Sequence, residues 1–187
     1  LSADGQELYI FRDDFGDGNI YVCNLKGSSW SEPVRLNDNI NSIFRETHAT
    51  VSADGQTLYF TSDRSGEGGM DIFRSRRLPT GEWAPAENLG ELINTKYDEE
   101  APFIHPDGKT LFFSSKGHSS MGGYDIFFSM LQDNGKWSTP MNVGYPMNTA
   151  EDEYFFVITP DGKRAYYSSS SGQGLGGKDI YLVHLET

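Results

Sequence analysis

An Asp-Gly pair followed by a strand-like run occurs four times in this chain, and its regular spacing constrains the fold more than any other feature. The pairs begin at Asp4, Asp54, Asp107 and Asp161, so consecutive copies are 50, 53 and 54 residues apart. A period near 50 residues is typical of repeat architectures, in which each copy is one supersecondary unit that packs on its neighbours. The chain is therefore expected to build the same unit four times.

The repeats follow one order of four short strand-like segments, A to D, which is complete in the second and third copies. Segment A begins with a glutamate, and the Asp-Gly turn joins it to segment B, which is apolar on both faces. A glycine-rich loop leads to segment C, and a second hairpin leads to segment D, which begins at a tryptophan and contains a proline. Because proline is confined to strand edges and ends, segment D is predicted to form the outer edge. The expected A segments are Glu46–Val51, Glu99–Ile104 and Glu153–Ile158, and the expected C segments begin at Asp71, Asp125 and Asp179.

Four antiparallel strands per repeat, packed between neighbouring repeats, predict an all-β fold, namely a β-propeller of four-stranded antiparallel blades. A β-sandwich is the alternative, but it gives no reason for Trp30, Trp83 and Trp137 to recur at intervals of 53 and 54 residues. We expect a single propeller region over residues 1–187. Its repeat units are about 1–45, 46–98, 99–152 and 153–187, of which the first and last are incomplete.

The segments with which the first repeat begins and the last repeat ends bear on the number of blades. The first copy lacks segment A and the last lacks segment D, so neither end supplies the strand that the other lacks. Stable proteins usually cover unpaired sheet edges. About four blades are represented here, and we expect them to be part of a larger propeller of about five to seven blades. The rival interpretation is a compact four-bladed ring whose closing strands are absent from this sequence.

The composition limits the classes of partner. The formal net charge of −12 opposes binding to nucleic acid or to an anionic membrane surface, because both select clustered lysine and arginine. No apolar run is long enough to be a membrane-spanning segment. The single cysteine, Cys23, excludes an internal disulfide. Basic partners, cations and neutral surfaces are compatible with this charge.

Three stretches of the third repeat resemble a known family. They are Pro106–Ser115, Gly122–Phe127 and Gly135–Gly144, which read PDGKTLFFSS, GGYDIF and GKWSTPMNVG. These stretches resemble the WD40-like propeller repeat of TolB type, in the version found in Bacteroidota envelope proteins of the OmpA family. The resemblance covers essentially the whole chain, although the first repeat departs from the Gly-Gly-x-Asp pattern.

That resemblance implies a place in the cell envelope, in the periplasm or associated with the outer membrane. In the family it points to, such repeats often precede an OmpA-like peptidoglycan-binding domain, and some members serve the type IX secretion and gliding apparatus. No OmpA-like segment is present in this sequence. The expected partners are therefore envelope proteins, with peptidoglycan reached only through a domain outside this chain.

The loops between segments B and C differ between copies, while the strands around them repeat. Recognition usually lies in varied loops on a constant scaffold, so the loops 63–68, 116–121 and 170–175 are predicted to bind a protein partner. The candidate rim-loop residues are Asp63, Arg64, Glu67, Lys116, His118, Met121, Gln173 and Leu175.

Glutamates open the segment expected to lie innermost. Glu46, Glu99 and Glu153 are candidate channel acids, which would attract a cation or a basic peptide. The alternative is that these carboxylates are bonded to backbone amides or paired across blades. His48, which aligns with Ala101 in the next repeat, is a candidate proton-sensitive group facing the channel.

No metal site is predicted. Asp71, Asp125 and Asp179 follow glycines at the start of segment C, but one carboxylate per blade provides too few ligands for calcium, so they are expected to hold their loops. The loop 13–19 slightly resembles a calcium-binding loop, but Phe15 stands where a ligand is required.

Enzyme signatures are also missing. The chain has no Gly-x-Ser-x-Gly motif, and its four histidines lack metal-ligand spacing, so no catalytic residue and no cofactor are predicted. The leading hypothesis is a non-catalytic propeller scaffold that binds protein partners in a Gram-negative cell envelope. The alternative is a ligand- or glycan-binding propeller, or the accessory propeller of a hydrolase whose catalytic domain lies outside this chain.

Overall fold

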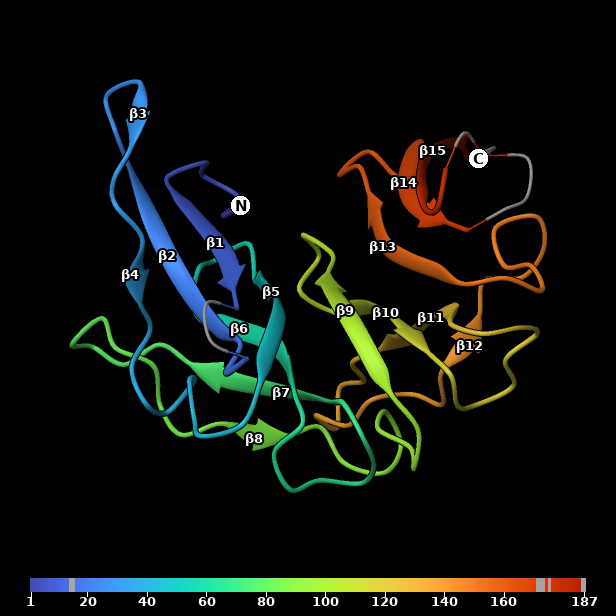
Figure 1. The fold of residues 1–187 in the computed structure, drawn as a ribbon, viewed down its shortest axis with the longest axis horizontal. Helices are drawn as coiled ribbons and strands as arrows, with labels where there is room; N and C mark the ends of the chain where they lie inside the picture. The colour runs from blue at the N-terminus through green and yellow to red at the C-terminus, as the bar shows by residue number, and fades with distance from the viewer. Residues whose placement is uncertain (14–15, 171–173, 175, 186–187) are drawn as a thin grey trace.

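The computed structural model describes residues 1–13, 16–170, 174 and 176–185, and the regular structure in this part of the chain consists of β-strands alone. Four antiparallel sheets lie around a common centre as the blades of a propeller (Figure 1). Blades one and two contain β1 (Glu7–Arg12), β2 (Asn19–Lys26), β3 (Ser29–Trp30), β4 (Val34–Arg35), β5 (Glu46–Val51), β6 (Thr57–Ser62), β7 (Asp71–Arg76) and β8 (Glu87–Asn88). Blades three and four contain β9 (Glu99–Ile104), β10 (Thr110–Ser115), β11 (Asp125–Met130), β12 (Met141–Asn142), β13 (Glu153–Ile158), β14 (Arg164–Ser169) and β15 (Asp179–His184).

The predicted fold class and the predicted order of segments are confirmed. The innermost strands β5, β9 and β13 begin at the three expected glutamates, and β7, β11 and β15 begin at the three expected aspartates. The outer segment D is interrupted: β3 and β4 both pair with β2, on either side of Pro33. Since proline has no N–H to donate, it breaks the ladder at this edge.

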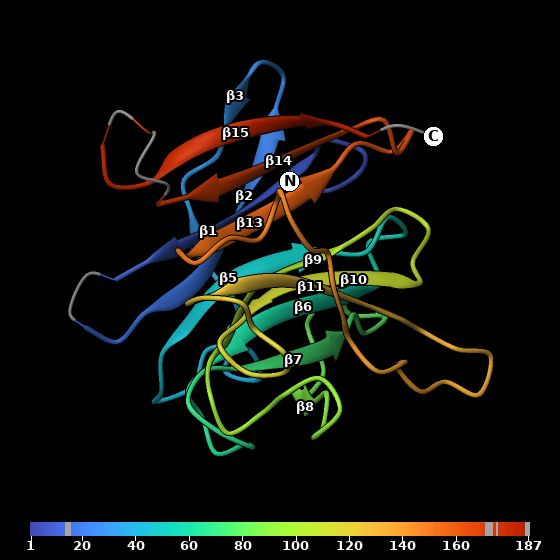
Figure 2. The same ribbon diagram turned by 90° about the vertical axis from the view of Figure 1, so that its right-hand side faces the viewer.

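The four blades form an arc that is open between its first and last members. Strand β1 contacts β5, β5 contacts β9, and β9 contacts β13, whereas no described strand of blade one contacts a strand of blade four. The opening separates β1 from β13 at the top of Figure 1. Figure 2 faces blade four and shows β13, β14 and β15 side by side, with β15 at the free edge. The four blades are confirmed, and the larger ring stays a prediction.

The Asp-Gly pairs are turns, as their sequence predicts. The four glycines have φ angles between 68° and 71°, in the left-handed region that glycine adopts without strain. In the second copy, Asp54 Oδ1 accepts hydrogen bonds from the Gln56 N–H at 2.9 Å and from the Ser52 hydroxyl at 2.5 Å. The aspartate therefore orders its own hairpin, and the repeated motif serves the fold.

A buried asparagine in each linker completes the hydrogen bonding of the preceding blade. Asn94 Oδ1 accepts from the Ile72 N–H at 2.8 Å, and Asn94 Nδ2 donates to the Ile72 carbonyl at 2.9 Å. The equivalent pairs are Asn41 with Ile20 and Asn148 with Ile126. The side-chain amide thus takes the place of a neighbouring strand and holds the linker against segment C.

Five residues later, a buried glutamate fixes the same linker to the following blade. Glu99 Oε2 accepts from the Thr95 N–H at 2.6 Å, and Oε1 accepts from the hydroxyls of Thr95 at 2.8 Å and Ser115 at 2.6 Å. The equivalent sets are Glu46 with Ser42 and Ser62, and Glu153 with Thr149 and Ser169.

These contacts overturn the hypothesis that Glu46, Glu99 and Glu153 are channel acids. All three side chains are fully buried, and both oxygens of each carboxylate accept hydrogen bonds from the linker or from segment B. Their charge is used inside the fold and is not presented to a ligand. The structure instead agrees with the alternative interpretation of the sequence, in which these carboxylates form hydrogen bonds with the protein itself.

Each interface between blades encloses an apolar core. Between blades one and two, Ile20 packs in one cluster with Phe60 and Trp83. Between blades two and three, the rings of Tyr59 and Trp137 meet edge to face with their centroids 6.2 Å apart. Full burial of an apolar side chain of this size contributes about 1.5–3 kcal/mol. The tryptophans Trp83 and Trp137 are thus packing anchors, as their spacing predicts.

Glycine pairs allow the B–C loops to approach the next linker closely. A Cβ atom on Gly122 would lie 2.5 Å from the Ala150 carbonyl carbon and 2.7 Å from the Thr149 oxygen. Gly176 holds the same position in blade four, where a Cβ would meet no atom within 4 Å. The Gly-Gly signature is therefore a requirement of blade-to-blade packing, and it has nothing to pack against at the end of the arc.

Gly122→Ala is expected to destabilise the protein by about 1–3 kcal/mol, because the added methyl collides with the backbone of the following linker. Gly176→Ala, the matched control, is expected to change the free energy of unfolding by less than about 0.5 kcal/mol. Chemical denaturation followed by tryptophan fluorescence measures both values. Equal losses in the two variants would show that the glycines serve the loop itself and not the blade contact.

Candidate functional site

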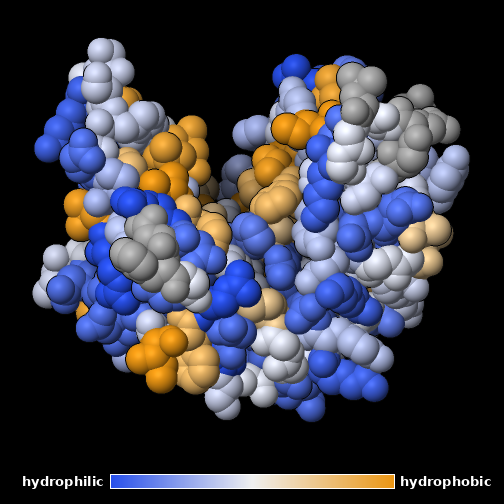
Figure 3. Space-filling model, in the orientation of Figure 1, coloured by the Kyte–Doolittle hydropathy of each residue, from blue (hydrophilic) through white to orange (hydrophobic). Residues whose placement is uncertain are grey.

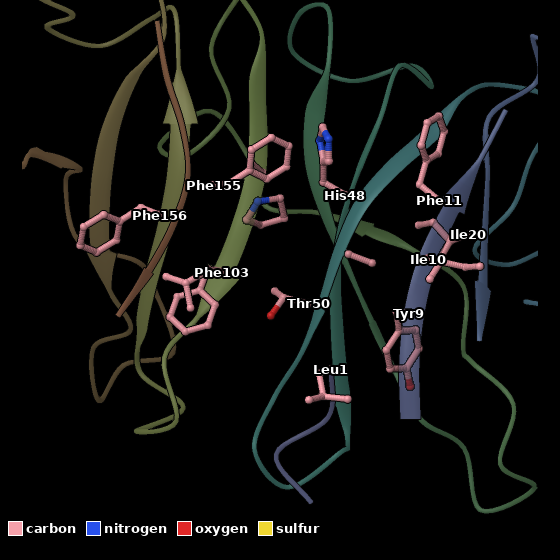
Figure 4. Close-up of a pocket in the computed structure, with 14 residues that line it drawn as sticks. Leu1, Tyr9, Ile10, Phe11, Ile20, His48, Thr50, Phe103, Phe155 and Phe156 are labelled. Atoms are coloured by element: carbon pink, nitrogen blue, oxygen red, sulfur yellow. The ribbon is translucent and has the colours of Figure 1, made fainter. Parts of the chain in front are cut away.

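A cleft of about 420 Å³ lies at the centre of the arc, between the first and fourth blades. Strand β1 forms one wall, β13 forms the other, and β5 and β9 lie between them, as Figure 4 shows. Apolar side chains line most of it, and Figure 3 shows apolar surface on both walls. The lining residues are Leu1, Tyr9, Ile10, Phe11, Ile20, His48, Ala49, Thr50, Ala101, Pro102, Phe103, Phe155, Phe156 and Val157.

Bulges in the innermost strands aim side chains at this cleft. The pairing register shifts at His48 in β5, at Ala101 in β9 and at Phe155 in β13. Ala101 and Phe155 have φ angles of 50° and 58°, a left-handed conformation that residues other than glycine rarely adopt. Such bulges re-aim a side chain and are frequent beside binding sites. Phe155 remains 45% exposed and lies edge to face against the His48 ring.

A polar group of residues borders the cleft at His48. The His48 Nδ1 atom lies 3.4 Å from Glu100 Oε2, and the Tyr124 hydroxyl lies between two carboxylates, 3.1 Å from Asp98 Oδ2 and 3.3 Å from Glu100 Oε1, with one hydrogen to donate. Lys116 Nζ forms an ion pair with Asp98 at 2.8 Å. The carboxylate of Asp98 is therefore neutralised by a lysine, whereas Glu100 faces a histidine and a tyrosine.

Aromatic rings extend this group toward blade four. The Tyr124 and Tyr154 rings pack with their centroids 4.4 Å apart, and Lys178 Nζ lies 3.5 Å from the Tyr154 centroid. Lys116 lies over the Tyr124 ring at 4.5 Å. Ammonium groups are attracted to ring faces at these distances. Three blades thus contribute to one rim of the cleft.

Burial sets the protonation states at the rim. Burial, followed by the charge of Lys178, lowers the pKa of His48 to about 4, so its imidazole is neutral near pH 7. Burial also raises the pKa of Glu100 above its ordinary value. The pair is therefore a neutral imidazole beside a partly desolvated carboxylate. The charged form of such a carboxylate is strongly stabilised when a cationic or hydrogen-bond-donating group of a ligand approaches it.

Two of the predicted rim-loop residues, Arg64 and His118, are held by the fold. Arg64 Nη2 donates to Glu46 Oε1 at 2.8 Å and to the Ile40 carbonyl. His118 Nε2 donates to the Ile93 carbonyl at 3.0 Å, the equivalent atom in the next linker. Different residue types thus perform the same task in two blades. These contacts anchor Arg64 Nη2 and His118 Nε2 to the fold, and a role of the two residues in partner binding stays a prediction.

The other rim-loop residues differ in how freely they are presented. Asp63 accepts from the Arg45 N–H at 2.7 Å, and Lys116 is paired with Asp98. The side chains of Glu67 and Met121 are exposed on the loops. Gln173 and Leu175 lie outside the described residues. A role in partner binding stays a prediction for Asp63, Glu67, Lys116 and Met121.

The aspartates at the start of segment C hold their loops. Asp71 Oδ2 accepts from the Asn88 amide at 3.1 Å and from the Glu67 N–H at 2.5 Å, and Asp125 makes the same contacts with Asn142 and Met121. No group of three or more histidine, cysteine or acidic residues in the described part of the chain is arranged to hold a metal ion. Part of the loop 13–19 lies outside the described residues. No helix in the described residues is long and apolar enough to cross a membrane.

The sequence identified part of this site. His48 does face the central cleft, as expected from its place in the innermost strand. The aromatic lining was missed, because Phe11, Phe103 and Phe155 resemble ordinary core residues in a strand. The alignment of Phe155 with His48 was the available signal, since both occupy the bulge position.

Comparisons with known proteins identify the fold. Neither a protein-family model nor a curated protein matches the chain. Solved structures do match, among them a putative TolB from Agrobacterium tumefaciens, with a TM-score of 0.55 and 13% sequence identity over 99% of this chain and 75% of that one. The repeats are therefore similar in fold to a TolB-type β-propeller.

Enzymes are also among the similar structures. The periplasmic gluconolactonase PpgL of Pseudomonas aeruginosa matches with a TM-score of 0.53 and 13% identity over 90% of this chain and 48% of its own. A prolyl endopeptidase matches with a TM-score of 0.53 and 18% identity over 96% of this chain and 26% of its own. The chain spans half or less of these enzymes, and identities at this level show a shared fold only.

Nuclear magnetic resonance titration of the histidines is expected to give a pKa near 4 for His48. Because the folded pKa lies below the ordinary value of 6.5, the unfolded chain binds this proton more readily. The contribution of His48 to stability is thus complete above pH 6.5 and is lost as the pH falls toward 4.

Lys178→Met should raise this pKa, since it removes a nearby positive charge, and Lys163→Met in the exposed turn of blade four should leave it unchanged. A His48 pKa at or above 6.5 would instead indicate an ion pair with Glu100 and would contradict the neutral imidazole.

Proposed function

We propose that this chain is a non-catalytic β-propeller scaffold that binds a protein partner in its central cleft. The observation that carries this proposal is the cleft itself, with apolar walls from β1 and β13 and a carboxylate at its rim. Concave apolar sites with a few convergent polar groups are the usual form of a binding site. The strands hold the walls rigidly, so little ordering cost opposes binding.

The chemistry of the cleft favours an extended peptide segment. Phe103 and Phe155 offer apolar contact to one side chain of such a segment, and Glu100 lies next to His48 at the rim. A basic or N–H donor group beside the apolar residue would pair with Glu100, whose burial makes such a contact stronger than in water. The net charge of −12 also attracts a basic segment over longer distances.

A place in the periplasm of a Gram-negative cell is part of the proposal. The likeness in fold to TolB and to a periplasmic gluconolactonase supports it, together with the resemblance of the repeats to Bacteroidota envelope proteins. Association with the outer membrane, with peptidoglycan or with secretion machinery would depend on a domain outside this chain. The likeness to the propellers of peptidases supports the alternative, an accessory propeller of a hydrolase.

Peptides selected from a random phage-displayed library against the protein should combine an apolar residue with a nearby basic one. Phe155→Asp is expected to weaken their binding at least about tenfold, because it removes a wall of the cleft. Aspartate tolerates the left-handed backbone at this position, so the strand is preserved. Fluorescence anisotropy with labelled peptides measures the dissociation constants.

The matched control is Ile43→Asp, which makes a comparable change on a linker residue that is exposed and outside the cleft. It should bind the peptides as the unaltered protein does. Peptides that bind Phe155→Asp with unchanged affinity would show that recognition lies elsewhere and would contradict the proposal. Selection of no peptide, with binding of oligosaccharides on a glycan array instead, would favour the ligand-binding alternative.

A further inference from the structure

A second cavity, a groove of about 640 Å³, lies between blades two and three. Residues of β6 and β7 form one wall, and the turn at Asp107 and Gly108 in blade three forms the other. The groove shares no lining residue with the central cleft. Both blades contain all four strands and already pack on each other, so the groove belongs to a complete interface.

Strand β7, which contributes to the first wall, departs from the repeat. It contains Arg74 and Arg76 and is followed by Arg77, and all three arginines line the groove. At the positions of Arg74 and Arg77 the other three blades have apolar residues. These are Val22, Phe128 and Leu182 in the first case and Leu25, Leu131 and Leu185 in the second. Because the other blades form the same strand without arginine, the fold of a blade does not require these charges.

Arg77 is committed to the contact with blade one. Its Nη2 donates to Glu7 Oε2 at 2.7 Å and lies 2.8 Å from the Tyr9 hydroxyl oxygen. Its guanidinium also lies over the Trp83 ring, 4.7 Å from the centroid. The replacement of leucine by arginine is therefore explained by packing at this position alone.

The other two arginines keep donors that face the groove. Arg74 Nε and Nη2 both lie 3.0 Å from Glu87 Oε2, an exposed contact of the kind that contributes little to stability, and Nη1 takes no part in it. Arg76 is exposed and forms no ion pair with any residue that the structure describes. Two guanidinium groups are thus available to a ligand.

Two hydroxyl groups stand beside these guanidinium groups. In the antiparallel register of β6 and β7, Thr57 pairs with Arg76 and Tyr59 pairs with Arg74. Paired residues, and residues two apart on one strand, project from the same face of a sheet. All four side chains therefore project from the face of blade two that packs on blade three, and all four line the groove.

Tyr59 is buried without a partner for its hydroxyl. The residue is 5% exposed and its ring packs on Trp137, but within the described chain its hydroxyl forms no hydrogen bond. Burial raises the pKa of Tyr59, and the nearby charges of Arg74 and Arg76 act in the opposite direction, so the hydroxyl keeps its proton beside two cations. Leaving a buried donor unsatisfied is costly, and an acceptor from a ligand would remove that cost.

The acidic residues of the groove limit the charge of that ligand. Asp54 and Asp107 are the acids that line it, and Asp54 Oδ1 and both oxygens of Asp107 already accept hydrogen bonds within their own hairpins. Three arginines and two aspartates leave one positive charge in excess among the lining side chains. A singly charged anion matches this excess better than a doubly charged phosphate does.

We propose that this groove is a second binding site, which takes a carboxylate between Arg74, Arg76 and the Tyr59 hydroxyl. The planar fork of a guanidinium matches the geometry of a carboxylate, and the hydroxyl supplies a further donor. The groove is larger than a carboxylate, so it also holds part of the molecule that carries this group. A free organic acid and an acidic side chain of a peptide supply the same chemistry. This inference does not depend on the function of the central cleft.

The experiment is a nuclear magnetic resonance titration that follows the Nε–H signals of Arg74 and Arg76 at constant ionic strength and pH 8. The probes are acetate, a hexaglutamate peptide and inorganic phosphate. Acetate and hexaglutamate should shift both signals in a saturable way, and phosphate should bind more weakly than acetate. Hexaglutamate binding at least about tenfold more tightly than acetate would assign the site to acidic peptides, and similar affinities would assign it to free acids.

Two variants each remove one donor from the site. Arg76→Gln is expected to weaken acetate binding about tenfold or more, because it removes a charged hydrogen-bond donor. Tyr59→Phe should weaken it about threefold or more without lowering the denaturation midpoint, since the hydroxyl has no partner in the described fold and the ring still packs on Trp137. A hydroxyl with a structural role would lower the midpoint instead.

Arg164→Gln is the matched control, because it removes the same charge from an exposed arginine at the position of Thr57 in blade four. It should bind acetate as the unaltered protein does, and so should Phe155→Asp, which alters only the central cleft. Shifts that do not saturate, equal losses in Arg76→Gln and Arg164→Gln, or phosphate binding more tightly than acetate would each overturn the proposal.

Discussion

The structure depends on pairs of buried polar side chains five residues apart, namely an asparagine in each linker and the glutamate that begins the following innermost strand. The asparagine forms hydrogen bonds with the backbone N–H and carbonyl of an isoleucine in one blade. The glutamate accepts hydrogen bonds from the linker and from a hydroxyl group of the next blade. A buried carboxylate or amide left without partners costs several kcal/mol, so these groups are tolerated only when the two blades and the linker are in one arrangement. The apolar interfaces supply most of the free energy, and the polar pair fixes their geometry.

The candidate site follows from that constraint. Because each glutamate anchors the start of an innermost strand, the bulge two residues later is placed at the centre of the arc. His48 and Phe155 therefore project into a cleft whose walls come from different blades. The same constraint occupies Arg64 and His118, since both bind the carbonyl of a linker isoleucine. These contacts are the reason why we propose the central cleft, and not the loops, as the binding site.

The period of the repeats was sufficient to predict the blades and the starts of most strands, because the Asp-Gly turns and the tryptophans obey local rules. The role of Glu99 was predicted only as an alternative, since a glutamate at a strand start can be a channel acid or a buried anchor until its partners Thr95 and Ser115 are placed. The bulge at Phe155 could not be predicted from the sequence either. A phenylalanine within an apolar strand carries no sign of a left-handed backbone.

Amide hydrogen exchange on the monomeric chain tests the central claim most directly. The Ile72 and Ile126 amides each donate to a linker asparagine, whereas no linker of the described chain covers the Ile180 amide. The account predicts that Ile72 and Ile126 exchange only by cooperative opening of the blades, and that Ile180 exchanges at least about 100-fold faster. Equal protection of the three amides would contradict the claim that the linkers hold the blades together.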